Sequence, residues 1–191
     1  MWNVLLDPLP EEWHGYPIDS DFQTGIQISQ CLVDEDLSEA ERFYTAVDML
    51  FPDPGNRPGN AEAADALEWF LNEFHHDNNF GEKRDVPVMD FDIDQWRIYA
   101  AFLSQYHIDL NTVKLHWFVF MGLLANLEEC VFTNVMGIRQ KKITAKMSSE
   151  EKKAIKQAKK IFAIKPPKEE RLSIAEQEAV DAFLELMNKN K

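Results

Sequence analysis

The residues best suited to chemistry in this sequence are its five histidines and its clustered carboxylates. His75, His76 and Asp77 are adjacent, and all three are residue types that bind metal ions. Adjacent side chains point in different directions, however, and no HExxH or paired Cys/His spacing completes a site. We therefore interpret this cluster as part of a solvated surface loop rather than as a metal centre.

His107 and His116 form a second candidate, because they accompany an expected pair of helices and lie beside Tyr106 and Trp117. Two imidazoles brought together there could act as a general acid and a general base. Nucleophilic catalysis would also need an activated side chain, and no serine or cysteine nucleophile motif accompanies them. We favour the interpretation that both are packing histidines.

Asp90, Asp92 and Asp94 could together bind Mg²⁺. Their spacing at a helix start fits capping and pairing with the helix dipole better. The seven glycines are scattered and form neither a GxGxxG nor a GxxxxGK[ST] phosphate-binding loop. We therefore expect a protein that is not an enzyme and that uses no metal or cofactor.

The net charge of −13 over 191 residues is unevenly distributed. Residues 1–90 contain 20 Asp and Glu against 4 Lys and Arg, whereas residues 139–165 contain ten basic and two acidic residues. This polarity favours electrostatic pairing between the halves of the chain, between copies in a homo-oligomer, or with partners. It argues against a protein that binds nucleic acid over its whole surface.

The lysine-rich helix expected after Ser148 is the one candidate for a nucleic-acid contact, since clustered lysines can neutralise phosphates. It lacks interleaved aromatic residues for base stacking and has few arginines for base reading. We favour a solvated face, or a face that docks on the acidic half of the protein.

The length suits one domain with a substantial core. Cys31 and Cys130 are far apart and form no CxxC pair, which indicates reduced packing residues of a cytosolic protein. The N-terminus has no signal-peptide pattern, and the apolar run Trp117–Ala125 is much shorter than the roughly 20 residues of a membrane span. We expect no membrane association.

The pattern predicts an all-α fold, an irregular helical bundle around a central antiparallel helix hairpin of residues 92–106 and 111–127. The second of these helices is apolar nearly all round, which indicates enclosure by other helices. Apolar residues share one face of the first: Trp96, Tyr99, Ala100 and Leu103. A small hairpin turning at His14–Gly15 is a further possibility.

Helix starts are predicted from capping residues, at Asp21, at Asn60 and at the capping boxes of Ser38 with Glu41 and of Ser148 with Glu151.

Paired prolines at Pro166–Pro167 divide a helical domain, residues 1–164, from a C-terminal segment, residues 165–191. Another capping box, Ser173 with Glu176, predicts a last amphipathic helix there. Its apolar face could lie in a groove of a partner, or it could pack back on the core. Our candidate partner-binding residues are Phe183, Leu184 and Met187, with Ile161 and Phe162 as second choice.

Several segments occur in a recognisable order: DFDIDQWRIYAAFLSQYHIDL, LHWFVFMGLLANL, FTNVMGIR and KMSSEEKKAIKQAKKIFAI. Together with the opening WNVLLDPLP and HGYPIDSDF, this order resembles a family of small siphophage tail-assembly proteins from phages and prophages of Gram-positive bacteria. The resemblance extends to about Ile164, and none of its segments is a catalytic motif.

The resemblance implies a tail assembly chaperone encoded between the tail tube protein and the tape measure protein. Such proteins coat the long helical tape measure protein in the host cytoplasm, help tube subunits polymerise around it, and are absent from the finished virion. The alternatives are a structural or connector protein that stays in the virion and a nucleic-acid-binding regulator that uses residues 139–165. The family supplies no catalytic residues and does not identify the client-binding surface.

Overall fold

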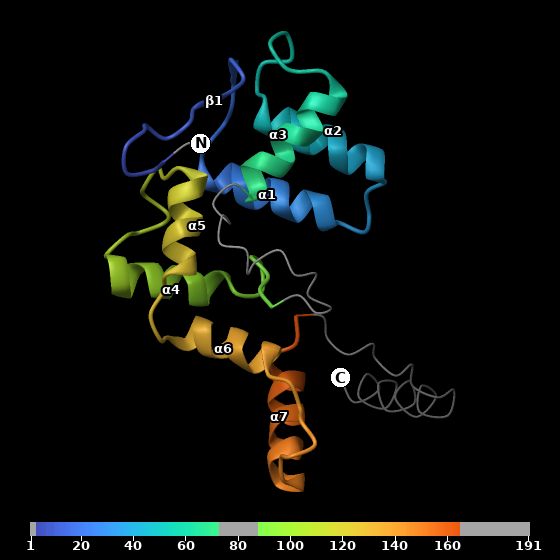
Figure 1. Ribbon diagram of the computed structural model, residues 1–191, viewed down its shortest axis with the longest axis vertical. Coiled ribbons are helices and arrows are strands. Elements are labelled where there is room, and N and C mark those ends of the chain that lie inside the picture. The colour runs from blue at the N-terminus through green and yellow to red at the C-terminus, as the bar shows by residue number, and fades with distance from the viewer. Residues whose placement is uncertain (1–2, 73–87, 165–191) are drawn as a thin grey trace, which may run out of the picture. The chain divides into compact units, whose positions relative to one another are not determined.

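The computed structural model describes residues 3–72 and 88–164, and these residues form seven helices and two short strands. The predicted all-α fold with a small β-hairpin is confirmed (Figure 1). In chain order the elements are β1 Glu12–Trp13, β2 Tyr16–Pro17, α1 Phe22–Val33, α2 Glu39–Leu50, α3 Asn60–Asn72, α4 Gln95–Tyr106, α5 Trp117–Ala125, α6 Val131–Gln140 and α7 Ser149–Ile161.

The β-hairpin turns where the sequence predicts it. β1 and β2 pair antiparallel, with Trp13 opposite Tyr16. His14 and Gly15 between them have φ angles of 51° and 86°, which is the left-handed conformation that a tight two-residue hairpin turn requires.

The predicted capping residues hold three of the helix starts. Asp21 caps α1 by accepting a hydrogen bond from a backbone N–H of its first turn. Ser38 and Ser148 begin α2 and α7 through complete capping boxes, with both reciprocal hydrogen bonds present. Asn60 is itself the first residue of α3, and its side-chain amide donates to the hydroxyl of Tyr44.

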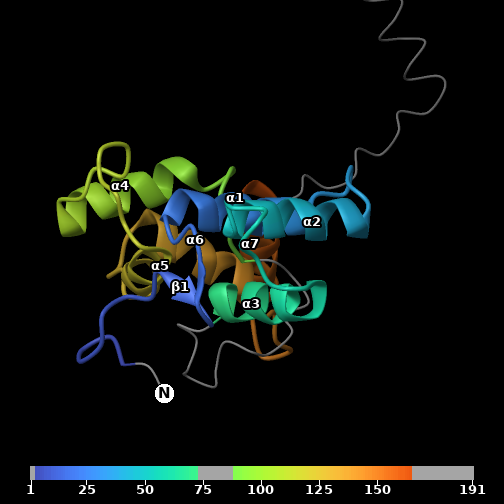
Figure 2. The same ribbon diagram turned by 90° about the horizontal axis from the view of Figure 1, so that it is seen from above.

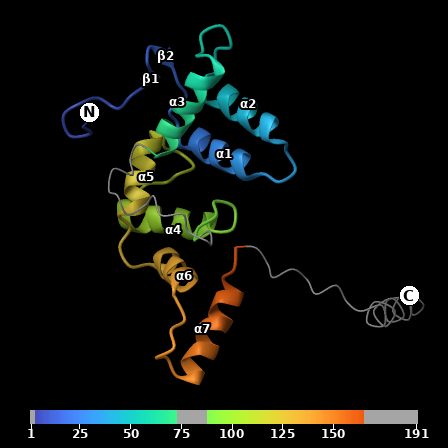
Figure 3. The ribbon, with the colours of Figure 1, turned by 45° about the vertical axis from the view of Figure 1, so that its right-hand side comes forward.

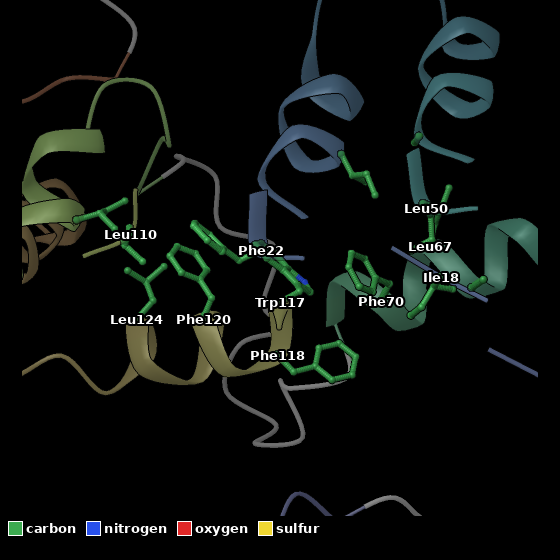
Figure 4. Packing of buried hydrophobic residues seen from close by; sticks show 14 of the residues in the cluster. Ile18, Phe22, Leu50, Leu67, Phe70, Leu110, Trp117, Phe118, Phe120 and Leu124 are labelled. Carbon is green, nitrogen blue, oxygen red and sulfur yellow. The ribbon is translucent and has the colours of Figure 1, made fainter. Parts of the chain in front are cut away.

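The described residues divide into two compact units between Met136 and Gly137, and α6 runs across the division. In the first unit α1 packs against α2, α3 and α5. Figure 2 shows α3 and α5 on the same side of α1. Aromatic rings pack between these helices (Figure 4). The ring centroids of Phe70 in α3 and Phe118 in α5 are 6.0 Å apart, and those of the stacked rings of Phe22 in α1 and Phe120 in α5 are 4.9 Å apart.

α1 and α5 begin side by side although almost a hundred residues separate them in the sequence. Asp21 and His116 form an isolated antiparallel β-bridge. The backbone N–H of Trp117 donates to the carbonyl of Ser20 (2.7 Å), and that of Phe22 donates to the carbonyl of Leu115 (2.9 Å). The bridge therefore fixes the position from which both helices start.

The predicted central antiparallel hairpin is wrong in its geometry. α5 begins at Trp117 rather than near residue 111, so residues 107–116 form a long connection, and α5 packs mainly along α1. α4 crosses α5 (Figure 3) and meets it where Phe102 stacks on Phe120 at 5.1 Å. The cause is the β-bridge, which directs α5 onto α1 rather than back along α4.

The second unit contains the end of α6 and all of α7. The buried Arg139 donates from Nε to the carbonyl of Phe162 (2.6 Å), and Lys152 donates from Nζ to the carbonyl of Ala145 (3.2 Å). These bonds hold both ends of α7 within the unit. None of the residues of α7 is buried.

Candidate functional site

The apolar face that the sequence predicts on α4 is real, but it points outward. Trp96 is 75% exposed and Leu103 is 44% exposed. The core is reached instead by a neighbouring stripe of the same helix: Ile98, Ala101 and Phe102. α4 therefore carries apolar side chains on a wider arc than the first unit buries, and the surplus is available to a partner.

A groove of about 300 Å³ lies beside this exposed face, between α1, α4 and the segment that follows α4. Trp96 lines it and meets Tyr99 edge-on, with the ring centroids 5.9 Å apart. Figure 4 shows three of its apolar lining residues converging from different parts of the chain: Phe22, Leu110 and Phe120. Such a groove suits a bulky apolar side chain from another protein.

Five aspartates and one arginine are next in sequence to lining residues: Asp21, Asp90, Asp92, Asp94, Asp109 and Arg97. Asp94 and Arg97 pair with each other, and the other four aspartates accept from neutral donors. Asp109 accepts from the hydroxyl of Tyr99 (3.2 Å), Asp92 accepts from the side-chain amide of Gln30 (2.7 Å), and Asp21 accepts from a backbone N–H. Neutral donors leave the negative charges in place, so the border attracts cations.

This groove was not predicted. The spacing of Trp96, Tyr99 and Leu103 was the available signal, because a second apolar stripe on one helix is more than one core contact needs. The other walls come from α1 and from residues around Leu110, whose approach to α4 depends on the tertiary structure.

Asp90 and Asp94, which precede α4, accept hydrogen bonds from donors of the protein itself. Asp90 accepts from the backbone N–H groups of Asp92 and Ile93, both at 2.9 Å. Asp94 is fully buried and pairs with Arg97 at 2.7 Å. Asp94, the residue before α4, makes no side-chain capping bond, and the N–H groups that Asp90 binds precede Gln95, so the predicted capping of α4 by these aspartates is wrong. Among residues 3–72 and 88–164, no group of three or more His, Cys, Asp or Glu side chains could hold a metal ion.

His116 has a structural function that the sequence did not reveal. Its Nδ1 accepts a hydrogen bond from the backbone N–H of Phe118 (3.0 Å), which caps α5, and its Nε2 lies 2.9 Å from the carbonyl of Pro10. Both contacts are satisfied by a neutral ring protonated at Nε2. Burial lowers the pKa of His116, and this effect exceeds the opposing ones of the Pro10 carbonyl and the Glu11 charge.

His107 ends α4 in the left-handed conformation, with a φ angle of 56°. It is exposed, whereas His116 is half-buried in the cap of α5. The two histidines therefore occupy helix ends with different tasks.

Of the predicted partner-binding residues, the structure describes two. Ile161 is 67% exposed at the end of α7. Phe162 is half-buried, and its carbonyl accepts from Arg139. Phe183, Leu184 and Met187 lie outside the described residues, as do His75, His76 and Asp77.

None of the helices in the described part of the chain is both long enough and apolar enough to cross a membrane.

Comparison with known proteins gives one finding. The model of a family described as bacteriophage Gp15 protein matches residues 5–164. No curated protein and no solved structure matches the chain.

Proposed function

The chain belongs to the bacteriophage Gp15 protein family, and from this premise we propose that it is a non-catalytic tail assembly chaperone. In this proposal it binds the tape measure protein of a siphophage in the host cytoplasm and keeps that helical client from aggregating. It then helps tail tube protein subunits to polymerise around the client and leaves before the virion is complete.

The observation that carries the proposal is the extent of the family match. It spans residues 5–164, the same part of the chain whose ordered segments resemble tail-assembly proteins. A phage protein that binds another protein is also consistent with a helical fold that leaves large apolar side chains exposed, among them Trp96, Leu103 and Ile161.

The proposed mechanism is shielding. Apolar faces of the chaperone cover hydrophobic helical segments of the client, while complementary charge guides their encounter and sets their register. The C-terminal residues Phe183, Leu184 and Met187 are the first choice for the client contact, since their spacing puts them on one face of a helix. Ile161 is the more accessible member of the second pair, because Phe162 is half-buried.

Co-expression with the tape measure protein tests this function. The full chain should keep the client in the soluble fraction, and a chain ending at Lys165 should leave it in the pellet. Replacing Leu184 by Glu should act like the truncation, whereas Glu178→Ala, off the apolar stripe of the same segment, should not. Full client solubility with the shortened chain would contradict the C-terminal assignment.

An insoluble client in the presence of every variant, the full chain included, would contradict the chaperone function itself. Mass spectrometry of purified virions separates this function from that of a structural or connector protein. A chaperone should be missing from the particles, and a stoichiometric amount of this chain in them would favour the structural alternative.

A further inference from the structure

We propose that the groove beside α4 receives α7 of a second copy of this chain, so that copies associate head to tail. This self-association goes beyond the client binding proposed above and does not depend on it. The argument rests on the shape and charge of the groove, on the surface of α7 and on the charge of the other available segment.

The groove is complementary to an apolar side chain on a basic helix. Its lining includes Phe22, Ile26 and Trp96 and contains no charged residue. Two carboxylates at its border, Asp92 and Asp109, accept from neutral donors: the side-chain amide of Gln30 for Asp92, and the hydroxyl of Tyr99 and the backbone N–H of Asn111 for Asp109. A helix with lysines beside an apolar stripe would therefore fit the groove. Its apolar side chains would contact the lining, and its lysines would pair with the carboxylates at the border.

α7 has this chemistry. Its apolar stripe ends in Ile161, which is 67% exposed, and two small residues precede Ile161 on the same face: Ala154 and Ala158. Small side chains let the helix backbone approach a surface closely while Ile161 projects into it. Lysines cover much of the remaining surface of α7: Lys152, Lys153, Lys156, Lys159 and Lys160.

The hydrogen bonds within the second unit hold the two ends of α7 and leave its apolar stripe exposed. The capping box of Ser148 and Glu151 begins α7, and the hydrogen bond from Arg139 to the carbonyl of Phe162 closes its other end. α7 is thus a capped helix whose apolar stripe is left uncovered. Amphipathic helices of this kind gain stability when that stripe is buried.

The C-terminal segment is a poorer occupant of the groove, although it too has an apolar stripe. Residues 165–191 contain six acidic and five basic residues, whereas α7 contains two acidic and five basic ones. Opposite charges across an interface favour association, so the acidic border of the groove favours the basic α7 over this nearly neutral segment. The basic α7 and the C-terminal segment are therefore suited to different partners.

A second copy is the occupant to which both surfaces are available. Each unit leaves its own surface exposed: Trp96 of the first unit is 75% exposed, and Ile161 of the second unit is 67% exposed. The two surfaces differ, which makes the contact heterologous, and each copy keeps one free groove and one free α7. Contacts of this type build rings or open chains.

The experiment measures the mass of the purified full chain in solution by light scattering and by sedimentation, at low and high salt. The wild-type chain should form oligomers that salt weakens, because the contact joins opposite charges. Trp96→Glu should prevent the groove from binding an apolar side chain, and Ile161→Glu should prevent α7 from inserting into a groove. Both side chains are largely exposed, so both variants should fold normally.

Each variant alone should raise the dissociation constant by at least about tenfold, as expected for losing a central apolar anchor. A mixture of the two should form a dimer and nothing larger, because one intact groove then meets one intact α7. Leu103→Glu is the matched control: Leu103 is exposed on α4 outside the groove lining, and its replacement should leave the wild-type oligomers unchanged.

A monomeric wild-type chain at low salt would overturn the proposal, and so would oligomers that survive both substitutions. A mixture that stays monomeric would also overturn it, since the two spoiled surfaces would then not be partners. Oligomers that dissociate on nuclease treatment would assign the association to bound nucleic acid instead. A chain ending at Lys165 should associate normally even if it fails to solubilise the client, which separates this proposal from the chaperone function.

Discussion

Gly25 of α1 lies directly against the indole ring of Trp117 at the start of α5. A Cβ atom at position 25 would be 2.2 Å from Cε3 and 2.3 Å from Cδ2 of that ring. Such distances are far inside van der Waals contact, and Trp117 is buried with little room to move. The absence of a side chain at Gly25 is therefore what lets α1 and α5 approach each other.

Replacing Gly25 by Ala should lower the free energy of unfolding by about 1–3 kcal/mol, because the added methyl group forces the Trp117 ring out of its position. Urea denaturation measures this loss. Gly122→Ala is the matched control within a helix, since a methyl group there meets nothing within 4 Å. It should leave stability unchanged or raise it by up to about 1 kcal/mol. Equal effects of the two substitutions would contradict the close approach.

Stability should fall as the pH is lowered through the titration of His116. Burial holds the pKa of His116 in the folded chain below the ordinary value of 6.5. The unfolded chain therefore takes up this proton first, and stability is lost from about pH 6.5 down to the folded pKa. Below that pKa the group contributes no further pH dependence. Protonation also removes the Nδ1 lone pair that caps α5.

Denaturation curves between about pH 5 and pH 7 measure this dependence. His116→Asn keeps a capping side chain but does not titrate, so its stability should depend less on pH than that of the wild-type chain. Parallel curves for wild type and His116→Asn would show that another group is responsible.

Local features of this fold could be predicted from the sequence, since neighbouring residues decide them. The capping boxes at Ser38 and Ser148 need only a side chain and a glutamate three residues later. The turn at His14–Gly15 needs only residues that accept a positive φ angle. Each of these was confirmed where the sequence placed it.

The pairing of α5 with α1 could not be predicted in the same way. It depends on the bridge between Asp21 and His116, which joins residues far apart in the chain. It also depends on the match between Gly25 and Trp117, which no spacing rule reveals. The expected hairpin assumed that consecutive helices pack together, and the bridge overrides that tendency. The groove was missed for the same reason.

The buried ion pair of Asp94 and Arg97 gives another prediction. The carboxylate of Asp94 is fully buried and lies 2.7 Å from the guanidinium of Arg97, so replacing Arg97 by Met would remove the cation that offsets a buried negative charge. The expected loss is about 3 kcal/mol in urea denaturation at neutral pH. Adding Asp94→Leu should recover part of this loss, because the buried negative charge that lacks a cation is then removed. Arg57→Met is the control: its ion pair with Asp48 is exposed and should contribute less than about 1 kcal/mol.

The thiol of Cys31 should react slowly in the folded protein. Its side chain is buried and contacts the carbonyl of Arg42, and burial, assisted by the charge of Asp34, raises its pKa above 9.0. Thiolate is the reactive form, so both access and ionisation oppose modification. In a Cys130→Ser variant, alkylation at mildly alkaline pH should be at least about tenfold slower for the folded chain than for the chain in urea. Equal rates would mean that the contact between α1 and α2 around Cys31 opens readily, because these helices cover the thiol.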